Sequence, residues 1–238
     1  MTKLASAAAF FAAVRADLFA GKLETSQVAG LNAILKSAGA HQCPLSWTAY
    51  ALATAYHETG QSIFPNRENM NYSVEGLMSK YSRSRISAAD ATLYGRGPSH
   101  SANQQKIANV LYGGKFGLEQ LGNTQPNDGW HFRGGGMDHC TGRKNYTAVD
   151  RALGLGGALV INPDLILDVD IAAGAMVTGM IVGRYTGKSF ERCLPNGSLG
   201  SLEHFSDARC IINGTDKAAT VAVYAGKFQH ALSAGGWA

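Results

Sequence analysis

Residues 45–60 read LSWTAYALATAYHETG, and this stretch decides the class of fold. Its larger apolar side chains recur at helical spacing on overlapping faces: Trp47, Ala51, Leu52, Ala55 and Tyr56. A helix that is apolar on most of its circumference must be covered by other elements, so the pattern predicts a buried central helix. Gly60 is expected to end this helix soon after Glu58.

The sequence on either side predicts further helices. Residues 1–40 are expected to form a helical hairpin with a turn at Gly21. Other helical patterns cover residues 88–94, 103–112, 143–153, 171–185 and 215–232, the last with Thr215 as its N-cap. Residues 131–140 are rich in glycine and are expected to hold a short extended piece.

No linker, repeat or low-complexity tail interrupts the chain, so we predict a single domain over residues 1–238. We expect it to be mainly α and bilobed, with at most a small β element. The hairpin of residues 1–40 is expected to pack on this domain. Residues 61–130 are the expected substrate-binding lobe, because this part of the sequence is largely polar and rich in glycine.

The composition excludes some classes of partner. The chain carries 21 Lys and Arg against 17 Asp and Glu, a net charge of +4. This charge suits adsorption to an anionic polymer and equally fits ordinary solubility, but it is too small for a dedicated nucleic-acid binder.

No run of about 18 uncharged apolar residues occurs, so no membrane insertion is expected. Residues 1–14 have the composition of a secretion signal, but Arg15, Asp17 and the helical spacing favour an ordinary helix.

The four cysteines are Cys43, Cys140, Cys193 and Cys210. They show no CxxC or Cys/His spacing, which argues against a zinc or thiol-redox site. We expect free thiols, and a disulfide between Cys193 and Cys210 stays open. A metal site built from His57, Asp138, His139 and Cys140 is disfavoured, because neighbours in an extended segment point to opposite faces. No metal or cofactor is expected.

Glu58 and Glu68 are the candidate catalytic carboxylates. Cleavage of a glycosidic bond requires one carboxylic acid to protonate the leaving oxygen, and a second carboxylate to activate water or attack carbon. Glu58 ends an apolar helix, where partial burial would raise its pKa as a general acid requires. Glu68 follows Gly60 and Pro65, in a loop that can turn back across a cleft. By spacing alone, a glutamate at the end of a helix is more often a solvated or capping residue.

Four blocks of sequence then follow in a recognisable order. They read AYALATAYHETG (49–60) with PNRENMNYS (65–73), DGWHFRGGGMDHCTGRKNY (128–146), INPDLILDVDIAAGAMVTGMI (161–181) and DARCIINGTDKAATVAVYAGKF (207–228). They resemble, in turn, the catalytic helix and loop, the glycine-rich segment, the buried helix and the Ile-Asn-Gly segment with closing helix of family-19 glycoside hydrolases. That family includes chitinases and related phage endolysins. The resemblance runs from about Ala51 to Leu232 and implies a lysozyme-like helical fold.

The resemblance implies roles for individual residues. Glu58 matches the family's general acid, and Glu68 matches its general base, which acts on water with inversion at the anomeric carbon. Thr141 matches the hydroxyl residue that helps to position this water. For inversion, the two carboxyl groups are expected roughly 6.5–9.5 Å apart, or somewhat more in an open form.

Substrate-binding positions follow in the same way. Asn213 matches a position that hydrogen-bonds the N-acetyl region of the sugar, and a turn asparagine before Gly214 is an equal alternative. Asn71 and Tyr72 are expected to line the same groove, although Tyr72 also fits packing between lobes.

One segment departs from the family pattern, at Gly135, Asp138, His139 and Cys140. The family has an arginine between its glycines and an apolar-Gln-Leu run before the hydroxyl residue. His139 is expected to replace the hydrogen bond of that glutamine to substrate, which would make activity depend on pH near neutrality. The sequence does not explain Asp138 at a usually apolar position.

We therefore expect an endolysin of muramidase type that cleaves β-1,4 bonds of peptidoglycan. Peptidoglycan is favoured because the disulfide framework of plant chitinases is missing and the N-terminal hairpin resembles that of phage-associated relatives. A chitinase and a catalytically impaired glycan-binding protein are the alternatives. A peptidase is disfavoured, since no HExxH or GxSxG motif occurs. We expect a monomer that accumulates in the host cytoplasm until lysis, with a place in a virion left open.

Overall fold

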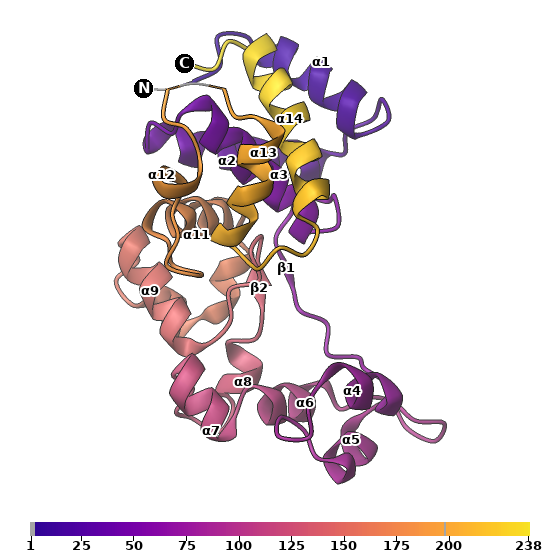
Figure 1. The fold of residues 1–238 in the computed structure, drawn as a ribbon. Coiled ribbons are helices and arrows are strands. Elements are labelled where there is room, and N and C mark those ends of the chain that lie inside the picture. The colour runs from indigo at the N-terminus through magenta and orange to yellow at the C-terminus, as the bar shows by residue number, and fades with distance from the viewer. Residues whose placement is uncertain (1–2, 198) are drawn as a thin grey trace. The chain divides into compact units, whose positions relative to one another are not determined.

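The computed structural model describes residues 3–197 and 199–238 and is mainly α-helical, as predicted (Figure 1). The described residues contain one two-stranded sheet, formed by β1 (Asn66–Arg67) and β2 (Gly135–Gly136). The extended piece expected within residues 131–140 is therefore confirmed. No helix in the described part of the chain combines the length and the apolar character needed to cross a membrane.

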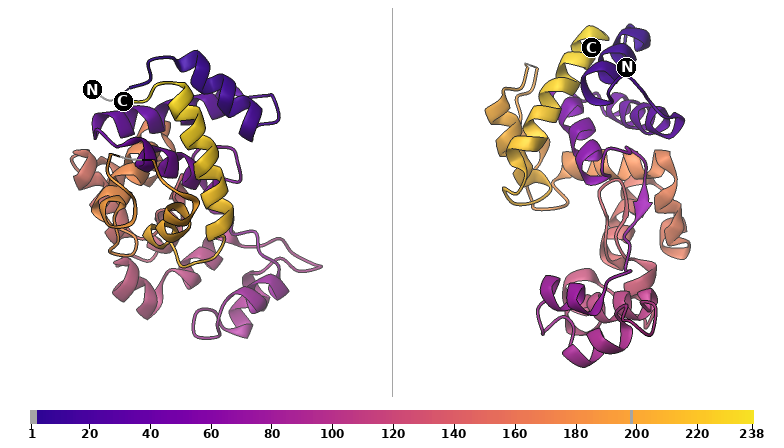
Figure 2. Two further views of the ribbon diagram at one scale, coloured as in Figure 1. Left: turned by 45° about the horizontal axis from the view of Figure 1, so that its top comes forward. Right: turned by 90° about the vertical axis from the view of Figure 1, so that its right-hand side faces the viewer.

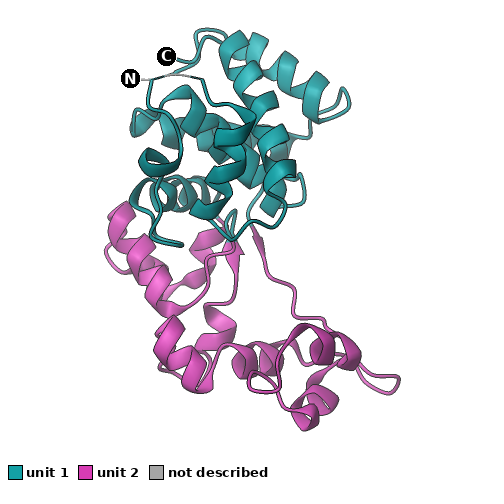
Figure 3. Ribbon diagram, viewed as in Figure 1, with its two compact units in different colours: residues 1–65, 136–138, 168–238 teal, residues 66–135, 139–167 magenta. Residues whose placement is uncertain are grey.

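The chain divides into two compact units (Figure 3). Unit 1 comprises residues 1–65, 136–138 and 168–238, and unit 2 comprises residues 66–135 and 139–167. Unit 1 is therefore assembled from segments that are distant in sequence, whereas unit 2 is formed almost entirely by the middle of the chain.

Unit 1 contains the longer helices. They are α1 (Ala7–Leu18), α2 (Thr25–Ala40), α3 (Leu45–Glu58), α11 (Val169–Val182), α12 (Phe190–Cys193), α13 (Leu202–Asp207), the 3-10 helix η3 (Ala208–Ile211) and α14 (Ala218–Ala234). The predicted central helix is α3, and it ends at Glu58 as expected, with Gly60 in the left-handed region at a φ of 59°. The two helices predicted within residues 1–40 are α1 and α2.

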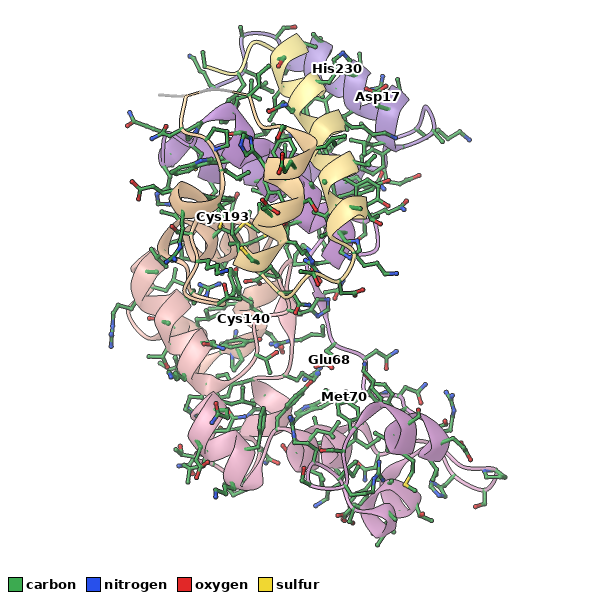
Figure 4. All side chains as sticks on the ribbon, in the orientation of Figure 1. Asp17, Glu68, Met70, Cys140, Cys193 and His230 are labelled. Atoms are coloured by element: carbon green, nitrogen blue, oxygen red, sulfur yellow. The ribbon has the colours of Figure 1, made fainter. Side chains whose placement is uncertain are left out.

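The core of unit 1 forms around α3, whose residues Ser46 to Tyr56 are all buried except Trp47. The helix α14 packs along α3 and also contacts α1 and α13, while α2 packs on α11 (Figure 2). Tyr50 stacks on Phe205, and the ring of Tyr56 meets Phe228 edge-on. At the surface, His230 of α14 lies 3.1 Å from Asp17 of α1 (Figure 4).

The predicted N-cap of the closing helix is wrong. The helix α14 begins at Ala218, and its N-cap is Lys217, which has a φ of 59° and makes no side-chain capping bond. The carbonyl of Thr215 instead accepts a hydrogen bond from the Ala218 N–H within a preceding turn. Residues 215–217 therefore form part of the turn that precedes the helix.

Unit 2 is built from short helices. They are α4 (Val74–Lys80), α5 (Ala88–Tyr94), α6 (Gln104–Leu111), α7 (Gly114–Phe116), the π-helix η1 (Gly117–Leu121), α8 (Asp128–His131), α9 (Arg143–Leu153), α10 (Ala158–Ile161) and the 3-10 helix η2 (Pro163–Leu167). A small apolar cluster holds part of it together: Met70, Leu77, Ile86, Ala91, Ile107, Ala108 and Leu111. The predicted helices at 88–94, 103–112 and 143–153 are confirmed.

Polar contacts fix the remainder of unit 2. The buried carboxylate of Asp128 accepts two hydrogen bonds from Arg143, at 2.8 and 2.5 Å, and two more from the backbone N–H groups of Thr124 and Gln125. Near the sheet, a Cβ added to Gly135 would lie 2.7 Å from the Tyr146 hydroxyl. Only glycine fits at this position without displacing its neighbours.

Candidate active site

A polar cavity of about 530 Å³ lies within unit 2. Its lining residues are Asn66, Arg67, Glu68, Asn69, Tyr72, Lys80, Tyr112, His139 and Thr141. Four residues singled out from the sequence therefore share one cavity: Glu68, Tyr72, His139 and Thr141. Asn71 is not among the lining residues; it is exposed, and its N–H donates to Asn69 Oδ1 at 2.8 Å.

The Glu68 side chain, labelled in Figure 4, is positioned by both backbone and side-chain contacts. It directly follows β1, and its N–H donates to the carbonyl of Gly134 at 2.8 Å. The Tyr112 hydroxyl, at the end of α6, lies 2.9 Å from Oε1 and 2.7 Å from Oε2. Burial and the neighbouring Glu68 charge raise the pKa of Tyr112, so its hydroxyl keeps the proton that it donates to the carboxylate.

The glycine-rich segment approaches Glu68 closely. A Cβ added to Gly134 would lie 3.1 Å from Glu68 Oε2 and 3.3 Å from His139 Nδ1. These distances are shorter than ordinary van der Waals contact, so the missing side chain at Gly134 leaves the carboxylate and the imidazole their space.

His139 and Thr141 follow in the same segment. His139 adopts a φ of 51°, which is uncommon for a residue other than glycine. The Thr141 hydroxyl donates to the His139 carbonyl at 2.9 Å, which fixes the direction of its proton. Its lone pairs remain able to accept a hydrogen bond from water or a sugar hydroxyl.

Tyr72 and Lys80 also line the cavity, and Tyr81 packs behind them. Lys80 Nζ donates to the Tyr72 hydroxyl at 2.7 Å and lies 4.9 Å from the centre of the Tyr72 ring. The Tyr81 hydroxyl donates to that of Tyr72 at 3.3 Å, and burial raises the pKa of Tyr81. Tyr72 therefore both lines the cavity and packs within unit 2.

Glu58 lies in unit 1, at the last position of α3. Its Oε1 accepts a hydrogen bond from Arg209 Nη1 at 2.7 Å, and the two side chains are 23% and 3% exposed. Arg209 Nε donates to the carbonyl of Asp216 at 2.9 Å, which holds the guanidinium in place. The partial burial expected of Glu58 is present, and its immediate neighbour is a cation.

Asn213 follows η3 in unit 1 and is exposed. Its Oδ1 accepts a hydrogen bond from the N–H of Gly214 at 2.8 Å, and its own N–H donates to the Arg209 carbonyl at 3.0 Å. These contacts are those of an asparagine in a turn.

The unusual Asp138 has a structural explanation. Its side chain is buried in unit 1, where Arg184 and the Tyr185 hydroxyl donate to its Oδ2 at 3.0 and 2.5 Å. The acid is thus the counter-ion of a largely buried arginine. Within the described residues, no three His, Cys, Asp or Glu side chains are grouped in a way that could hold a metal ion.

Three residues of these sites were not predicted from the sequence: Tyr112, Lys80 and Arg209. Tyr112 and Lys80 each end a short helix and carry no motif of their own, so their link to Glu68 and Tyr72 emerges only from folding. Arg209 was visible within the DARCIING block, but its partner Glu58 is 151 residues away.

No family model matches the chain. A glycosyl hydrolase family 19 domain-containing protein of Haemophilus influenzae is 35% identical to it over 106 residues. The chain resembles a family-19 protein. The aligned residues make up 44% of this chain and 48% of the relative, so the match spans about half the length of the family-19 relative.

Proposed function

We propose that this protein is a glycoside hydrolase that cleaves β-1,4 bonds of peptidoglycan as an endolysin of muramidase type. The observation that carries the proposal is the Glu68 carboxylate, held by Tyr112 in a polar cavity that also contains the Thr141 hydroxyl. The similarity to a family-19 glycosyl hydrolase domain-containing protein supports the reaction class.

In the proposed reaction, Glu68 removes a proton from water while the water attacks the anomeric carbon. Thr141 accepts a hydrogen bond from that water, since its own proton is directed to the His139 carbonyl. Glu58 protonates the leaving oxygen, and the product has inverted configuration. The Arg209 guanidinium donates a hydrogen bond to Glu58 Oε1 and so orients the carboxyl group.

Digestion of purified peptidoglycan tests this function, with the products identified by mass spectrometry. New reducing sugar ends are expected from the wild-type protein. Glu58→Gln and Glu68→Gln are each expected to lower kcat by about 100- to 10,000-fold, the usual range for loss of a general acid or base. Glu203→Gln and Glu75→Gln, at exposed positions in units 1 and 2, are the matched controls.

Other results of these assays would indicate a different function. Cleavage of chitin without cleavage of peptidoglycan would identify a chitinase. Binding of either glycan without new reducing ends would identify a binding protein. Anhydro ends would indicate a transglycosylase, and wild-type rates in both glutamine variants would exclude the mechanism.

A further inference from the structure

Lys80 brings a positive charge to the cavity that contains Glu68. It is the last residue of α4, its side chain is exposed, and it is one of the residues that line the cavity. A lysine at the end of a helix stabilises the helix dipole wherever its side chain points. That role does not require the contacts that direct this amine to Tyr72.

The amine is held in place by aromatic side chains. Its Nζ donates to the Tyr72 hydroxyl at 2.7 Å and lies 4.9 and 5.6 Å from the ring centres of Tyr72 and Tyr81. The Tyr81 hydroxyl in turn bonds to that of Tyr72. Cation–π contacts and a neutral hydroxyl fix an ammonium group without cancelling its charge.

The other strong cation of the cavity is already neutralised. Arg67 Nη2 lies 2.7 Å from Asp164 and 2.6 Å from the Pro163 carbonyl, and Nη1 donates to the Arg133 carbonyl and the Tyr146 hydroxyl. Across residues 3–197 and 199–238, by contrast, Lys80 has no acidic side chain within salt-bridge distance. A fixed amine with two further donor hydrogens therefore faces the cavity.

We propose that Lys80 is a specificity-determining residue that binds a carboxylate on the substrate. This inference rests on the proposed function and narrows its substrate class to acidic amino-sugar polymers. Chitin carries no carboxylate, whereas peptidoglycan carries carboxylates on its peptide stems and, where a stem has been removed, on the lactyl group of its muramic acid. A charge-assisted hydrogen bond from Lys80 would add affinity for the acidic polymer alone.

A cycle of protein and substrate changes tests the pairing. Wild type and Lys80→Met are compared on peptide-free glycan strands that carry the lactyl carboxylate, and on the same strands after conversion of that group to a methyl amide. Loss of either partner is expected to raise KM about 3- to 10-fold with kcat nearly unchanged, as for one partly exposed ion pair. Loss of both is expected to cost no more than loss of one, because the same contact is removed.

Lys106→Met is the matched control, since Lys106 is exposed in unit 2 and does not line the cavity. It is expected to behave as wild type on both strands. An effect of Lys80→Met only on strands with intact stems would assign the pairing to a stem carboxylate. Equal losses on the acid and amide strands, or no loss on any acidic strand, would overturn the role of Lys80.

Failure of the proposed hydrolase function can be distinguished from failure of the proposed role of Lys80. A wild-type protein that cleaves no glycan would refute the hydrolase. Titration of N-acetylmuramic acid, with N-acetylglucosamine as the neutral probe, would still report on Lys80 by NMR. Shifts that are specific to the acidic sugar and lost in Lys80→Met would uphold the carboxylate contact, and identical shifts from both sugars would refute it.

Discussion

The Tyr112 hydroxyl lies within hydrogen-bonding distance of both carboxylate oxygens of Glu68, at 2.9 and 2.7 Å. One proton shared over two oxygens fixes the plane of the carboxylate and leaves lone pairs on both oxygens for water. Tyr112 is thus a positioning residue for the proposed base.

Tyr112→Phe is therefore expected to lower kcat about 10-fold or more and to leave KM nearly unchanged, because a hydrogen bond to a charged group is removed. Steady-state kinetics on peptidoglycan strands measure this split. Tyr94→Phe, in the same unit and away from the cavity lining, is the control. A matching rise in KM would instead mean that Tyr112 binds substrate.

Arg209→Met tests the cation beside Glu58. The substitution removes the Arg209 donor from both the Glu58 carboxylate and the Asp216 carbonyl, so the free energy of unfolding is expected to fall by about 1–3 kcal/mol. Urea denaturation measures the loss, with the exposed Arg192→Met as control. Activity is expected to fall as well, and the double variant with Glu58→Gln is expected to be no less active than Glu58→Gln alone.

Gly134→Ala tests the space beside Glu68. The added methyl group would press on the Glu68 carboxylate and on the His139 ring, so kcat is expected to fall while the far-ultraviolet circular dichroism stays unchanged. Gly214→Ala adds the same methyl group where nothing lies within 4 Å, and it is expected to be neutral. Full activity of Gly134→Ala would show that the carboxylate tolerates displacement.

The Asp128 and Arg143 pair predicts how unit 2 responds to acid. Burial opposes ionisation of Asp128, but the hydrogen bonds from Arg143, Gln125 and Thr124 outweigh it and hold its pKa below the ordinary value of 3.8. Because the pKa of Asp128 is lower in the folded state than in the unfolded state, its ionised form stabilises the fold at pH values above the unfolded-state pKa. This stabilisation is lost as the pH falls through the folded-state pKa. Asp128→Asn is expected to lower the free energy of unfolding by roughly 2–4 kcal/mol at pH 7, and by less at acidic pH. Equal losses at both pH values would contradict this linkage.

Cys193 and Cys210 are free thiols whose sulfurs lie 3.5 Å apart in unit 1. Oxidised glutathione is expected to convert them to a disulfide through a mixed disulfide, with both electrons passing to glutathione. Burial raises the pKa of Cys193 to about 11, so the reaction is expected to accelerate as pH rises toward that value. Peptide mapping without reductant detects the bond, and Cys210→Ser is expected to abolish it.

The sequence predicts the helices well where one pattern repeats over several turns. The apolar run of α3 and the amphipathic run of α9 each set their own boundaries, because burial of one face determines the structure. The short helices α4 and α12 were missed although α5, as short as α4, was predicted, because one or two turns carry too little periodicity to indicate a helix every time. The prediction of Thr215 as N-cap was wrong because Lys217 adopts a left-handed backbone conformation, which no sequence pattern indicates.

The candidate site was predicted only in part, for a related reason. Glu68, His139 and Thr141 stand in motifs, and the fold brings them to one cavity. Tyr112 and Lys80 act through contacts made by the ends of α6 and α4, and such contacts depend on the directions of helices rather than on local sequence. The burial of Asp138 against Arg184 likewise joins distant segments.

The wide separation of Glu58 from its partner has a consequence for biosynthesis. A ribosome that has just added Glu58 must extend the chain by 151 residues before Arg209 exists. At ordinary elongation rates this takes roughly 8 to 30 seconds. Throughout that interval the nascent α3 lacks α14, the helix that packs along it, so part of its apolar surface stays uncovered by its native partner.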